Sequence, residues 1–133
     1  MSHTHHNKQN HTKNRHLPTI AECNAAIASS RVPLPLKAEA FLFRALCHRE
    51  EGNPDEELAD YNTLLSMSES PAELKAVAHN FRALYYLHER KHAEAIADYL
   101  AVLANSEAPP GISNHARIAV SVLKDEEDGA AAA

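Results

Sequence analysis

The chain has 133 residues, of which 44% are hydrophobic, and its formal net charge is −5. Its length and apolar content suit one domain with a single core. The 13 Lys and Arg residues are scattered along the chain, so the composition gives no general attraction for phosphate backbones and argues against nucleic acid as a partner. Few Gly, no Trp and many Ala, Leu and Glu favour an all-α fold, because Ala, Leu and Glu lose little side-chain freedom in a helix.

Residues 1–16 are polar and rich in histidine. The histidines are His3, His5, His6, His11 and His16. Without an apolar residue after Met1, this segment cannot bury enough surface to offset the entropy of ordering, and the composition predicts a disordered tail. Histidine-rich tracts can bind zinc, nickel or copper, which leaves a metal-handling protein as an alternative function. The segment lacks the apolar run of a secretory signal and no run of 18 apolar residues follows, so we expect a cytoplasmic protein without a membrane partner.

A first helix is expected over residues 19–30. Thr19 followed by Glu22 fits a capping box, and apolar residues recur behind it at helical spacing. Cys23 belongs to this helix, and Cys47 follows 24 residues later without a CxxC pair. Two cysteines at this spacing build neither a disulfide framework nor a zinc cage, so reduced, buried thiols are expected.

Prolines and a glycine divide the rest of the chain into five further helices. They are predicted over residues 36–51, 54–67, 71–90, 92–105 and 113–124. In the first of them, Leu36, Ala40, Phe43 and Cys47 share one apolar face. The helix over 71–90 is apolar over a wide arc, which predicts a central helix packed on more than one side. Residues 125–133, acidic and then mostly Ala, are expected to form a flexible tail.

A 38-residue unit occurs twice, over residues 33–70 and 71–108. The two copies are identical at 17 positions, where unrelated stretches of ordinary composition would share roughly two or three. When the chain is aligned with itself at a shift of 38 residues, the first predicted helix aligns with the second half of the unit and the last predicted helix aligns with the first half. The sequence therefore predicts two full units flanked by half units.

Each copy reads as helix, short turn, helix over residues 38–65 and 76–103, and this pattern resembles a tetratricopeptide repeat. Ala45 and Ala83 match the small residue at which the family's two helices cross. Tyr61 and Tyr99 match its aromatic residue late in the second helix, and Gly52 matches its turn glycine. The period of 38 exceeds the usual 34, Glu57 replaces an Ala, and Arg90 replaces a Gly. The resemblance covers residues 17–124 and implies an antiparallel helix-hairpin array wound as a right-handed superhelix.

The resemblance implies a protein–protein interaction module, without catalytic activity or a cofactor, that holds a peptide, helix or partner protein in its inner groove. The groove residues expected from it are Leu42, Leu46, Arg49, Val77, Asn80, Leu84, Leu87 and His88. Some family grooves hold a C-terminal carboxylate with Lys, Asn and Arg, but the corresponding positions here are Leu42, Leu46 and Phe81. Such an apolar groove suits an amphipathic helix or another copy of the same protein. Alternatively, the last helix or the long loops cover these leucines as core.

Residues 88–92 read His-Glu-Arg-Lys-His and match the H-E-x-x-H pattern of zinc hydrolases. That chemistry needs both imidazoles on one face of one continuous helix. The internal repeat aligns these residues with the turn at 50–54, so we expect them to straddle a turn. A hydrolase is therefore the minor alternative.

Two charged pairs recur at the same place in both copies. Arg44 and Asp60 lie 16 residues apart in the first, and Arg82 and Asp98 in the second. Recurrence at one internal position favours a contact that joins the two helices of each unit over a role in ligand chemistry.

Overall fold

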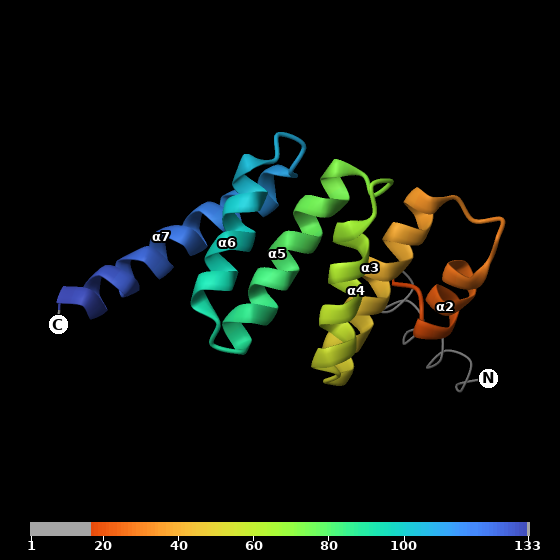
Figure 1. Ribbon diagram of the computed structural model, residues 1–133, viewed down its shortest axis with the longest axis horizontal. Coiled ribbons are helices and arrows are strands. Elements are labelled where there is room, and N and C mark those ends of the chain that lie inside the picture. Colours follow the sequence, from red (N-terminus) through yellow and green to blue (C-terminus); the bar gives the residue numbers. More distant parts are fainter. Residues whose placement is uncertain (1–16, 133) are drawn as a thin grey trace, which may run out of the picture.

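The computed structural model describes residues 17–132, and every regular element in that range is an α-helix. The helices are α2 (Ile20–Ala28), α3 (Leu34–Glu51), α4 (Pro54–Ser66), α5 (Ala72–His88), α6 (His92–Ala104) and α7 (Pro110–Ala132). Figure 1 shows them packed in chain order, with α2 and α7 at opposite ends. The predicted all-α array is confirmed. Within the described range, none of these helices is long and apolar enough to cross a membrane.

The capping box predicted for the first helix is present at the start of α2. The Thr19 hydroxyl accepts a hydrogen bond from the Glu22 amide at 3.1 Å, and the Glu22 carboxylate accepts one from the Thr19 amide at 3.0 Å. The next helix begins at Leu34, earlier than predicted. Pro33 caps it and Pro35 lies in its first turn, where no backbone N–H is needed for the helix ladder.

The helix predicted over 113–124 is too short at both ends, because α7 runs from Pro110 to Ala132. Pro110 is tolerated at the first helical position, so the Pro-Pro-Gly run marks a start and not only a break. At the other end Glu and Ala are good helix formers, and Gly129 alone does not stop the helix.

The turns after α3 and α5 use the same backbone conformation. Gly52 ends α3 with φ 74°, and Arg90, 38 residues later, has φ 59°. Both values lie in the left-handed region, which glycine enters without strain and arginine does not. The helix predicted over 71–90 therefore ends earlier, at His88.

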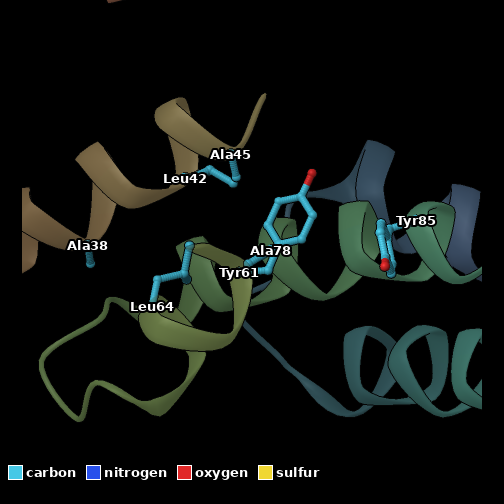
Figure 2. Packing of buried hydrophobic residues seen from close by; sticks show 7 residues of the cluster. All are labelled: Ala38, Leu42, Ala45, Tyr61, Leu64, Ala78 and Tyr85. Carbon is cyan, nitrogen blue, oxygen red and sulfur yellow. The ribbon is translucent and has the colours of Figure 1, made fainter. Parts of the chain in front are cut away.

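Helix α5 contacts α3, α4, α6 and α7, as predicted for a central helix. It divides the core into two clusters. The α3–α5 cluster contains Ala38, Leu42, Ala45, Tyr61, Leu64, Ala78 and Tyr85, and Figure 2 shows these side chains on their three helices. The α5–α7 cluster contains Ala83, Ala95, Tyr99, Val102, Ala116 and Leu123. Leu36, placed by the sequence on the apolar face of this helix, is 52% exposed.

Both recurring ion pairs are present and bidentate. Arg44 donates to the Asp60 carboxylate at 2.9 and 2.8 Å, and Arg82 donates to that of Asp98 at 2.8 and 2.7 Å. Both carboxylates are buried. Each arginine also donates to an asparagine of the helix that precedes its own, Asn24 or Asn62, at 2.8 Å. Each arginine thus joins three successive helices, which positions neighbouring units relative to one another.

Candidate functional site

A cleft of about 480 Å³ opens where the end of α3, the start of α4 and the end of α5 meet. Its lining residues are Arg49, Gly52, Pro54, Glu57, Leu84, Tyr85, His88 and Glu89. The local sequence explains how the first two helices meet here. The left-handed Gly52 ends α3 and Pro54 begins α4, so the chain reverses within a few residues and both helices face the end of α5.

Only part of the predicted groove lines this cleft, namely Arg49, Leu84 and His88. Leu46 and Val77 are half-buried and pack against the α3–α5 cluster, and Leu87 packs against the α5–α7 cluster.

Leu42 and Asn80 were also expected in the groove, but both are buried. Leu42 belongs to the α3–α5 cluster. The Asn80 side-chain oxygen lies 3.0 Å from His115 Nδ1 of α7. Each position is covered by the first helix of the following unit. Helix α5 packs against Leu42, and α7 contacts Asn80. At Asn80 the covering helix is the last one, α7.

Glu57 was not among the predicted groove residues, although it stands where the resembled family has Ala. Glu57 is buried, and its Oε2 accepts a hydrogen bond of 2.7 Å from the Tyr61 hydroxyl. Burial, followed by the bond to Glu57, raises the pKa of Tyr61 well above its usual range, so this hydroxyl stays protonated and donates. Within residues 17–130, no cation lies within ion-pair distance of the Glu57 carboxylate.

The rest of the cleft combines charge with apolar surface. The Arg49 guanidinium lies over the Phe81 ring, 5.5 Å from its centroid, and forms no ion pair with a carboxylate of the described chain. Burial, followed by the charge of Glu89, raises the pKa of Tyr85, so its ring is a neutral wall. The cleft therefore offers one buried anion, one exposed cation and an apolar wall.

The H-E-x-x-H match does not lie on one helix. His88 is the last residue of α5 and His92 is the first of α6, with the left-handed Arg90 between them. The prediction that the match straddles a turn is confirmed. Over residues 17–132, no group of three or more His, Cys, Asp or Glu side chains is placed to hold a metal ion. The histidine-rich segment 1–16, predicted to be a disordered tail and the basis of the metal-handling alternative, lies outside the described residues.

Comparisons with known proteins add no relative. No family model, curated protein or solved structure matches the chain.

Proposed function

We propose that this chain is a tetratricopeptide-like interaction module that binds a segment of a partner protein in the cleft between α3, α4 and α5. The observation that carries the proposal is the buried Glu57 carboxylate, which lines an open cleft and has no cationic partner in the described chain. Arg49 lines the same cleft but forms no ion pair with Glu57, so the buried carboxylate still has acceptor positions for a ligand that brings a cation.

The chemistry of the cleft selects a basic side chain next to an apolar one. A lysine ammonium or arginine guanidinium can donate a charge-assisted hydrogen bond to Glu57, whose Oε2 is already held by Tyr61. Leu84, Pro54 and the Tyr85 ring offer the apolar wall on which a neighbouring aliphatic side chain can pack.

Selection from a random peptide library tests this proposal. We expect the protein to enrich peptides with adjacent basic and apolar residues, and Glu57→Gln to weaken their binding about tenfold or more. Glutamine keeps an oxygen that accepts the Tyr61 bond but removes the charge. Glu56→Gln is the matched control, because Glu56 is exposed on the same helix and does not line the cleft.

The apolar wall is tested by Leu84→Glu, which should abolish binding while helicity and melting stay nearly unchanged. Leu84 lines the cleft and belongs to neither core cluster. Leu46→Glu is the contrasting variant and should lower the melting temperature, because Leu46 packs against the α3–α5 cluster. Selected peptides that bind Glu57→Gln or Leu84→Glu as tightly as the unmodified chain would contradict the proposal.

A further inference from the structure

The helices at the two ends of the array are each half of a unit. A full unit consists of a first helix and a second helix, and α3 with α4 and α5 with α6 are the full units. In the 38-residue register α2 corresponds to the second helices, and α7 corresponds to the first helices. Figure 1 shows α2 and α7 at opposite ends, so they cannot complete each other within one copy.

Helix α7 does not turn back where the other first helices do. The chain reverses at Gly52 and Arg90, both in the left-handed conformation. The next position in the register is Asp128, and it lies inside α7, which continues to Ala132. The place beside α7 that a second helix would occupy is therefore left open by the described residues.

The face of α7 that would receive neighbours is exposed and partly apolar. In the register Leu42, Asn80 and Ile118 are equivalent, yet the first two are 4% exposed and Ile118 is 66% exposed. Val122, one turn further along the same face, is 50% exposed. Ser121 is a small, exposed residue at the place where Ala45 and Ala83 are fully buried against their second helices.

At the other end of the array, α2 and the start of α3 expose residues whose equivalents are covered within the full units. Leu36 is 52% exposed, whereas its equivalents Leu74 and Ile112 pack against the two core clusters. Glu22 of α2 is exposed at the place where Asp60 and Asp98 are buried against their first helices.

We propose that a second copy of the chain covers these faces, so that α2 of one copy completes a unit with α7 of another and the Leu36 end of α3 packs near Ile118 and Val122. The contact continues an interface that already occurs twice within the molecule, between successive first helices and between the helices of one unit. Two different surfaces meet, so the contact is heterologous and can repeat along a row of copies. It uses surfaces distinct from the cleft between α3, α4 and α5.

The charges of residues at equivalent positions of the 38-residue repeat support this arrangement. Within the second unit His79 Nδ1 lies 2.8 Å from the Asp98 carboxylate. The equivalent residues at the ends are Arg117 on α7 and Glu22 on α2, both exposed and of opposite charge. An Arg117–Glu22 ion pair across two copies would take the place of the internal His79–Asp98 contact.

Sedimentation velocity from about 1 µM to about 1 mM tests the proposal. We expect the average mass to rise above the 14.6 kDa of one copy as the concentration rises. Leu36→Glu blocks one end, and Ile118→Glu with Val122→Glu blocks the other, so each variant should be monomeric alone. All three side chains are exposed, so circular dichroism and melting should match those of the unmodified chain. Ala93→Glu with Ala97→Glu adds two charges to an exposed face of α6 and is the matched control, which should associate normally.

A mixture of the two blocked variants distinguishes a head-to-tail contact from a symmetric contact between two α7 faces. Each retains the end that the other lacks, so the mixture should form a one-to-one complex and nothing larger. A self-pairing α7 face would instead let Leu36→Glu dimerise alone, and that result would overturn the head-to-tail contact. Arg117→Glu should weaken association, because it would place a second carboxylate against Glu22. Glu22 itself stays unchanged in this test, because its carboxylate closes the capping box at Thr19. A monomeric unmodified chain over the whole concentration range would overturn the proposal outright.

Discussion

At the scale of single residues, two equivalent tyrosines differ in one hydrogen bond. Tyr61 and Tyr99 are both fully buried, 38 positions apart. Tyr61 donates to Glu57, but the equivalent of Glu57 in the second unit is Ala95. The Tyr99 hydroxyl is left without a hydrogen-bond partner among the described residues. Both units thus keep the tyrosine ring that fills the core, but only the first unit keeps a hydrogen-bond acceptor for its hydroxyl.

Phenylalanine at the two positions should therefore have opposite consequences. Tyr61→Phe removes a hydrogen bond to a buried carboxylate and should lower the free energy of unfolding by about 1–3 kcal/mol. Tyr99→Phe removes a buried group that makes no bond and should be neutral or stabilising by up to about 1 kcal/mol. Chemical denaturation of both variants measures the difference. Equal losses at the two positions would show that Tyr99 has a partner.

Arg90 stores backbone strain that a glycine would release. A residue with a Cβ is destabilised by roughly 1–2 kcal/mol in the left-handed region, and glycine is not. Glycine also has more conformational entropy in the unfolded chain, which offsets part of this gain. Arg90→Gly should therefore raise the free energy of unfolding by about 0.5–1 kcal/mol. The reverse change, Gly52→Ala, should destabilise by about 1 kcal/mol. An added Cβ at Gly52 meets no atom within 4 Å, so its effect isolates the backbone term. A destabilised Arg90→Gly variant would contradict this interpretation.

At the scale of elements, the buried carboxylates of the second helices hold the array together. Asp98 accepts bonds from Arg82 and lies against His79, both on α5. Burial acts to raise the pKa of Asp98, but the contacts with His79 and Arg82 outweigh it and hold the pKa below its usual value. Since the pKa is lower in the folded state, Asp98 stabilises the fold above the unfolded-state pKa, and this contribution is lost as the pH falls through the folded-state pKa.

Stability should therefore fall below about pH 4, the region in which an unfolded aspartate begins to bind protons. Asp98→Asn should cost about 2–3 kcal/mol at pH 7 and should make the remaining stability less dependent on pH between about 2 and 5. Urea denaturation across that range measures both effects. Asp125→Asn, at an exposed position on α7, serves as the control and should leave the pH profile unchanged. Identical acid profiles for the Asp98→Asn variant and the unmodified chain would exclude this role of Asp98.

At the scale of the whole molecule, stability is distributed over two clusters that share α5. The buried residues of the clusters lie between Ala38 and Leu123. Helix α5 contributes to both, so the two units should unfold together, as neighbours coupled through a shared interface do in helical repeats.

Removal of residues 1–16 should leave the melting temperature unchanged, because this segment has no apolar residue after Met1 and the buried members of both clusters lie elsewhere. Differential scanning calorimetry of the full and shortened chains checks this expectation. Zinc or nickel that raises the melting temperature of the full chain but not of the shortened one would instead favour the metal-handling alternative.

The sequence by itself determined the features that depend on local order. Helical periodicity, the capping box at Thr19 and the turn at Gly52 predicted the class and order of the elements. The duplication predicted the Arg44–Asp60 and Arg82–Asp98 contacts, because a pair that recurs in register is favoured by the packing of one unit.

Only the tertiary structure decided which apolar and polar side chains remain accessible. Leu42 and Ile118 occupy the same place in the repeat, yet one is core and the other is exposed, because the next first helix covers only the former. The residues that line the cleft could not be predicted together. They come from three helices, and only the packing of these helices places Glu57 and Leu84 in the same cleft. A helical pattern states which residues share a face. Which neighbour covers that face depends on contacts distant in sequence, and these arise only when the array is assembled.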